Sequence, residues 1–143
     1  MSKRSVFTVL LACGLAVLGA PQARAQFALE LKADIPFEFR AGEATMPAGP
    51  YMISPDRHVT RNVLLLNSRE NDAAAFVLTI TADTGQVQDQ SRLVFHKYGD
   101  RYFLTQVWVS GERTGWQIPT GRSERELAER AARHEVVAVL AQR

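Results

Sequence analysis

Two long apolar runs that flank a glycine constrain this chain more than any other feature. Residues 92–98 and 101–109 lie on either side of Gly99 and Asp100. A glycine at the first loop position fits a two-residue type II′ turn, whose twist matches that of the two strands it joins. The sequence therefore predicts a β-hairpin here.

The register of this hairpin indicates where it lies in the fold. A two-residue loop pairs His96 with Phe103 and Phe95 with Leu104. One face then carries Leu93, Phe95, Lys97, Tyr102, Leu104 and Trp108, and the other carries Val94, His96, Tyr98, Phe103 and Val107. Because both faces are largely apolar, we expect the pair in the middle of a β-sandwich or in the wall of a covered barrel.

Most of the remaining sequence also has strand character. Alternating or short continuous apolar runs occur at residues 27–32, 35–39, 51–53, 63–66 and 75–81. A length of 143 residues is enough for one domain. We therefore predict a mainly β protein: a single compact antiparallel β-sandwich or barrel-like domain over residues 26–143.

Near the C-terminus the pattern changes to that of a helix. Ser123 and Glu126 have the spacing of a capping box, which predicts a helix over about residues 123–133 with Ser123 as its N-cap. Leu127 and Ala131 give it only a narrow apolar stripe. The run at residues 136–140 predicts a final strand that returns to the sheet.

The first 25 residues have the features of a cleavable secretory signal peptide. Lys3 and Arg4 precede an apolar run, and Ala23-Arg24-Ala25 supplies the small-x-small pattern before a cut at Gln26. We therefore expect a periplasmic or secreted protein.

Two other interpretations of this segment remain as alternatives. A membrane anchor would need about 18 apolar residues, whereas this run is followed by Pro21 and Arg24. Acylation at Cys13 would make a lipoprotein, but that cysteine lies in the middle of the apolar run. We expect no membrane span after cleavage.

Removal of this segment changes the charge of the protein. The full sequence has 17 basic and 15 acidic residues. Lys3, Arg4 and Arg24 leave with the signal, so 14 basic residues face 15 acidic ones. A protein without net positive charge or a basic cluster does not attract a phosphate backbone, so we expect no nucleic-acid partner. The mature protein has no cysteine and must be stabilised by packing alone.

No pattern of catalytic residues stands out, and we name no catalytic residue. Asp56 and His58 have a spacing that suits a base with an orienting carboxylate, but they lie in a polar turn. His96 lies within the apolar hairpin, where it has two interpretations: a structural histidine that hydrogen-bonds a neighbour, or a ligand or base. His134 is expected at the C-terminal end of the helix, where a cation is favourable.

Metal and cofactor binding are likewise not indicated. Asp34, Glu38 and Glu43 are close in sequence but do not form a calcium-loop motif. We predict no metal site and no cofactor.

Aromatic side chains are the best candidates for a binding surface, because flat rings bury area at low entropic cost. The aromatic residues considered are Tyr51, Tyr98, Tyr102, Trp108 and Trp116. Trp116 lies in a glycine-rich stretch and is expected in a loop, away from the core. The predicted binding residues are Trp116, Tyr98, Tyr102 and His96, and plain core packing is the alternative.

Several stretches together resemble a family of small secreted proteins that is abundant in acidobacterial soil bacteria and has no characterised activity. The matching stretches are Ile35-Pro36-Phe37-x-Phe39, Pro47-Ala48-Gly49-x-Tyr51, residues 93–104, Trp108 and Ser123-x-x-Glu126-Leu127-Ala128. The resemblance covers nearly the whole mature protein and implies no catalytic residue, cofactor or substrate.

Three functions are compatible with these features. The first is an exported, non-catalytic binding, structural or envelope-associated module whose partner is an unidentified protein or envelope polymer. The second is a secreted hydrolase, which needs His96 or His58 beside a carboxylate in a pocket. The third is a small-ligand carrier, which needs an enclosed cavity in a barrel mouth.

Overall fold

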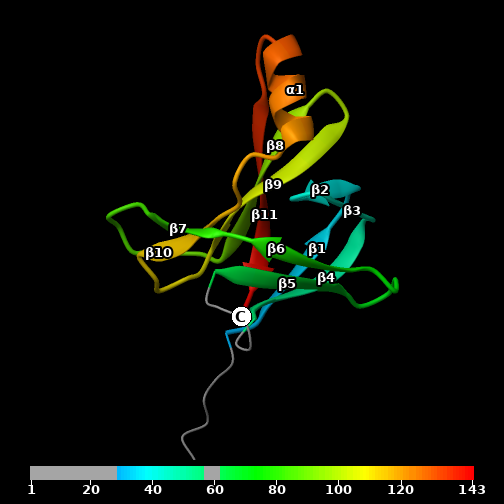
Figure 1. Ribbon diagram of the computed structural model, residues 1–143. Helices are drawn as coiled ribbons and strands as arrows, with labels where there is room; N and C mark the ends of the chain where they lie inside the picture. The colour runs from blue at the N-terminus through cyan, green and yellow to red at the C-terminus, as the bar shows by residue number, and fades with distance from the viewer. Residues whose placement is uncertain (1–28, 57–61) are drawn as a thin grey trace, which may run out of the picture.

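The computed structural model describes residues 29–56 and 62–143 (Figure 1). The predicted signal peptide, Cys13 and His58 lie outside the described residues. The strands are β1 Leu31–Ile35, β2 Phe39–Ala41, β3 Ala44–Met46, β4 Gly49–Pro55, β5 Val63–Ser68, β6 Ala74–Leu78, β7 Ile80–Asp83, β8 Arg92–Tyr98, β9 Arg101–Trp108, β10 Thr114–Gln117 and β11 Glu135–Gln142, and the helix is α1 Arg122–Arg130.

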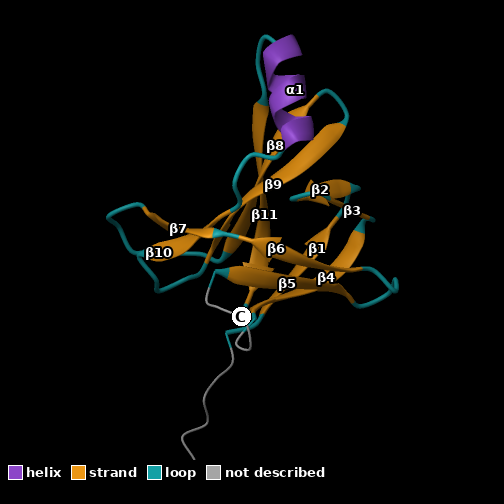
Figure 2. Cartoon of the chain, in the orientation of Figure 1, coloured by secondary structure: helices purple, strands orange, loops and turns teal. Residues whose placement is uncertain are grey.

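The strands form a nearly closed, barrel-like sheet (Figure 2). Hydrogen-bonded neighbours follow the order β3, β2, β9, β8, β11, β1, β4, β5, β6. Directly after β6 comes β7, which pairs with β10, and β10 pairs in turn with β9. These pairs are antiparallel except for the one between β2 and β9, which is parallel. The predicted fold class is confirmed, with a barrel-like closure of the sheet.

The predicted hairpin is present as β8 and β9. Phe95 pairs with Leu104 and His96 with Phe103. Gly99 has a φ of +60°, and no non-glycine residue among those described has a positive φ. Asp100 therefore has a negative φ, which fits the predicted type II′ turn and excludes type I′.

A β-bulge changes the faces of the second half of this hairpin. The register shifts by one residue beside Phe95, so Val107 pairs with Leu93 and Trp108 with Arg92. Thr105 is the extra residue, and its hydroxyl donates to the carbonyl of Val94 at 3.0 Å. The predicted faces of Val107 and Trp108 were therefore wrong, because one inserted residue exchanges the two sides of a strand.

The core fills the inside of this sheet. Alternate residues of the strands point inward, and β1 shows the pattern most clearly, since Leu31, Ala33 and Ile35 are buried and the two residues between them are exposed. Phe39, Tyr51 and Phe95 meet edge to face at ring-centroid distances of 5.3 and 5.4 Å. The largest fully buried side chains are Tyr51, Phe39, Phe95, Leu31, Ile35, Met46, Ile53, Leu64, Leu66, Leu93, Leu104 and Val107.

The helix is shorter than predicted and is capped differently. It begins at Arg122 after the N-cap Gly121, which has extended backbone angles and makes no side-chain cap bond. Ser123 lies inside the helix and its hydroxyl has no hydrogen-bond partner. Glu126 pairs with Arg122 at 2.9 Å instead of reaching back to Ser123. The predicted capping box was therefore wrong. The final strand is confirmed and is longer than predicted, since β11 spans Glu135–Gln142.

Candidate functional site

Two regions outside the core gather side chains with chemical or binding potential. The first, which we call the histidine cluster, consists of His96, Tyr98, Glu124 and His134. The second, which we call the apolar row, consists of Phe76, Leu78 and Ile80.

The histidine cluster forms where α1 approaches the outer face of β8 (Figure 1). His96 and Tyr98 lie on the face of β8 opposite the buried ring of Phe95. Nδ1 of His96 lies 3.0 Å from Oε1 of Glu124, and the Tyr98 hydroxyl donates to the same oxygen at 3.4 Å. His96 and Tyr98 thus converge on the carboxylate of Glu124, a residue that is only 4% exposed.

His134 completes the cluster from the segment between α1 and β11. Its ring centroid lies 4.3 Å from that of His96 and 5.4 Å from that of Tyr98. The helix ends at Arg130, so His134 does not cap its C-terminus as predicted. Burial raises the pKa of Tyr98, and the charge of Glu124 and its hydrogen bond raise it further. Tyr98 therefore remains a protonated donor to Glu124 at neutral pH.

Sequence reasoning missed Glu124, although a signal for it was present. Glu124 stands three residues before Leu127 and seven before Ala131, which is the spacing of one helical face. It therefore lies on the predicted inward stripe, and it is the buried residue of α1. A carboxylate on the inward face of a helix needs a donor in the sheet below it.

The other predicted binding residues lie elsewhere. Tyr102 stacks on Phe37 with a centroid distance of 3.7 Å, on the opposite side of the sheet from His96. Trp116 lies in strand β10 and packs partly buried against the core, so the predicted loop position was wrong. The structure therefore brings His96 and Tyr98 together and places Tyr102 and Trp116 apart from them.

Two further aromatic candidates are parts of the packed interior. Tyr51 is fully buried and its hydroxyl donates to the carbonyl of Pro47 at 2.6 Å. Burial raises its pKa, although a hydrogen bond with Ser68 lowers it in part. Trp108 is 3% exposed and its indole N–H donates to Gln106 at 3.1 Å.

The acidic residues considered for calcium do not gather at one place. Asp34 lies on β1, Glu38 follows it in the connection to β2, and Glu43 lies in the turn between β2 and β3, where it pairs with Arg40 at 3.9 Å. Within residues 29–56 and 62–143, no three His, Asp or Glu side chains are arranged to hold a metal ion.

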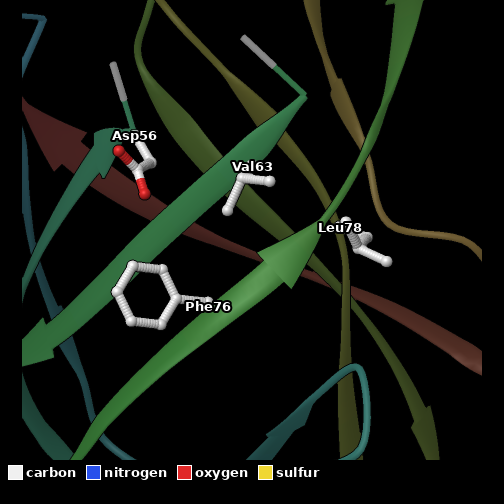
Figure 3. Close-up of a pocket in the computed structure, with 4 residues that line it drawn as sticks. All are labelled: Asp56, Val63, Phe76 and Leu78. Carbon is white, nitrogen blue, oxygen red and sulfur yellow. The ribbon is translucent and has the colours of Figure 1, made fainter. Parts of the chain in front are cut away.

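The apolar row lies where β6 leads into β7. Phe76, Leu78 and Ile80 occupy every second position and are 69%, 73% and 52% exposed. Beside it, a pocket of about 290 Å³ is lined by Asp56, Val63, Phe76 and Leu78 (Figure 3). Asp56 directly follows β4, and its backbone N–H donates to the carbonyl of Val63 at 2.8 Å. The sheet therefore presents an aromatic ring and an aliphatic group at a shallow pocket.

These positions bear on the three functions considered above. His96 has the carboxylate partner that a base needs, but the pocket beside the apolar row is lined by other residues. That pocket is open to solvent. Among the residues that the structure describes, no helix is long and apolar enough to cross a membrane. Searches of protein-family models, curated proteins and solved structures find no match to this sequence.

Proposed function

We propose that this protein is an exported, non-catalytic binding module that holds a short extended apolar segment of a partner protein against the exposed side chains of β6 and of the first residue of β7. The observation that carries the proposal is the apolar row. Large apolar side chains exposed at successive outward positions of a strand mark an interaction site more often than isolated ones do. Export and a periplasmic or secreted location are part of the proposal and rest on the N-terminal sequence.

The size of the row favours a short segment over a folded partner. Its three side chains together expose roughly 300–400 Å² of apolar surface. A stable interface between two folded proteins buries about 800 Å² on each side. The row thus offers at most about half of that area, which suits a segment of a few residues.

The pattern of the row favours an extended conformation for that segment. Phe76 and Leu78 lie two residues apart, and alternate side chains of a strand are spaced about 6.6–6.8 Å apart. An extended peptide repeats its side chains at the same interval, so one of its apolar side chains can pack between Phe76 and Leu78. Residues 73–82 contain no charged side chain, so Asp56, at the rim of the adjoining pocket, is the charged group that a bound segment would approach.

Binding of an alternating Val-Thr peptide of ten residues, followed by fluorescence anisotropy, tests this proposal. The double variant Phe76→Ser/Leu78→Ser is expected to weaken the affinity at least tenfold, because it removes both large side chains of β6. Val136→Ser/Leu140→Ser is the matched control, since these β11 side chains are 64% and 62% exposed but lie outside the row. Absence of binding by the unmodified protein, or equal loss in both double variants, would contradict the proposal.

A further inference from the structure

We infer that His96 and Tyr98, with the ring of His134 packed against both, form a carboxylate-binding site and that Glu124 occupies this site in cis. The ligand class is a carboxylate, as in an acidic side chain or the C-terminus of a polypeptide. The inference is independent of the apolar row, which lies on other strands.

The donors of this site belong to a rigid part of the sheet. His96 and Tyr98 are on β8, which is hydrogen-bonded to β9 on one side and to β11 on the other. Tyr98 is 8% exposed and its ring meets that of Phe103 edge to face at 5.8 Å. Side chains held in this way keep their donors in place without the carboxylate.

The carboxylate belongs to an element with few other contacts. The helix has nine residues, and Glu124 is its buried residue. Leu127 is only partly buried, and the other side chains that follow it in the helix are exposed. Isolated helices of this length are marginal in water, so α1 depends on its contacts with the sheet. The principal polar contact is the one made by Glu124.

The other charged groups near the site are paired elsewhere, which leaves His96 and Tyr98 as the partners of the Glu124 carboxylate. Within α1, Arg122 pairs with Glu126 at 2.9 Å, so that cation is engaged along the helix. Lys97 of β8 pairs with Glu135 of β11 at 3.0 Å. Glu43, from the turn between β2 and β3, lies near Gly121 at the start of the helix. The ionisable side chains that face Glu124 are therefore His96 and Tyr98, with His134 packed against both.

Because the donors are fixed on the sheet and the carboxylate is carried by a weakly attached helix, the site can bind a carboxylate from another molecule when Glu124 is absent. When Glu124 is truncated, the two donors lose their acceptor and remain partly shielded from water. A small carboxylate can then restore both hydrogen bonds, and its binding stabilises the folded state by mass action.

Acetate is the probe for this test, with chloride at equal ionic strength as the reference. In Glu124→Ala, acetate at ten times its dissociation constant is expected to raise the Tm by about 3–6 °C. The ring signals of His96 and His134 should shift saturably over the same titration. The unmodified protein and the control Glu126→Ala should respond equally to acetate and chloride, because Glu124 fills the site in both.

One additional variant, and one further outcome of Glu124→Ala, keep the test decisive. The double variant Glu124→Ala/His96→Phe should lose the saturable response, since phenylalanine keeps a ring at this position but has no hydrogen-bond donor. If Glu124→Ala is unfolded in chloride, acetate is expected to restore its fold. Equal behaviour of Glu124→Ala in acetate and chloride, folded or unfolded, would overturn the inference and leave Glu124 as a helix anchor only.

Discussion

Replacing Phe95 by alanine is expected to lower the free energy of unfolding by about 3–5 kcal/mol. Phe95 is fully buried on β8, and the rings of Phe37 and Phe39 contact it edge to face at centroid distances of 5.1 and 5.4 Å. Its removal leaves a cavity between strands whose backbones are hydrogen-bonded on both sides and cannot close over it. Urea unfolding should show a lower midpoint with an unchanged slope.

Phe76→Ala is the matched control, because it makes the same chemical change on the outside of the sheet. Phe76 is 69% exposed, so its truncation is expected to change the free energy of unfolding by no more than about 0.5 kcal/mol. Equal losses in the two variants would contradict the assignment of the β8 inner face to the core. A destabilised Phe76→Ala would also weaken the proposed function, since a residue that stabilises the fold is not free to serve a partner.

The hairpin shows what could be predicted from the sequence and where prediction ended. Its turn and the pairs next to it depend on Gly99 and on the residues directly beside it, so local pattern was sufficient. The bulge at Thr105 could not be predicted, because Thr105 is an ordinary strand residue between Leu104 and Gln106, with no glycine or proline beside it to mark an interruption. Because of the bulge, Val107 and Trp108 each lie on the face of β9 opposite to the one predicted.

The histidine cluster could be predicted only in part, because its members are distant in sequence. His96 and Tyr98 share a face of one strand, and that much follows from the period of two. Glu124 lies 28 residues after His96, and His134 follows the helix. Their approach depends on where α1 crosses the sheet, which no local pattern specifies.

The apolar row illustrates a different limit. The strand over residues 75–81 was predicted from its composition, and β6 and β7 occupy that stretch. In β6 both faces are apolar, with Ala75 and Val77 on one and Phe76 and Leu78 on the other, so the sequence alone did not indicate which face would meet solvent. The closure of the whole sheet decides that Ala75 and Val77 are buried and that Phe76 and Leu78 are exposed.

Gly115→Ala is expected to lower the free energy of unfolding by about 3 kcal/mol or more, at or above the upper end for overpacking. A Cβ at this position would lie 2.5 Å from the carbonyl oxygen of Val107 and 2.6 Å from Cε3 of Trp108. The Val107 oxygen is a backbone atom of β9, and β10 is hydrogen-bonded to β9. Neither strand can therefore move away from the new Cβ without disturbing the other. The backbone of Gly115 is not in the left-handed region, so the cost comes from space and not from conformation.

The same substitution should open the ring of strands at a defined place. β10 joins β9 to β7, and both tryptophans of the protein, Trp108 and Trp116, lie at this junction. Displacement of β10 is therefore expected to red-shift the tryptophan emission before global unfolding. Gly121→Ala is the control, since the one close approach of its Cβ would be to the exposed, flexible carboxylate of Glu43 at 2.9 Å, with the backbone oxygen of Gly42 at an ordinary contact distance of 3.8 Å. Its cost should stay near about 1 kcal/mol or below. Because a flexible carboxylate moves aside and a paired backbone does not, equal stability of the two variants would contradict the close approach of β10 to Trp108.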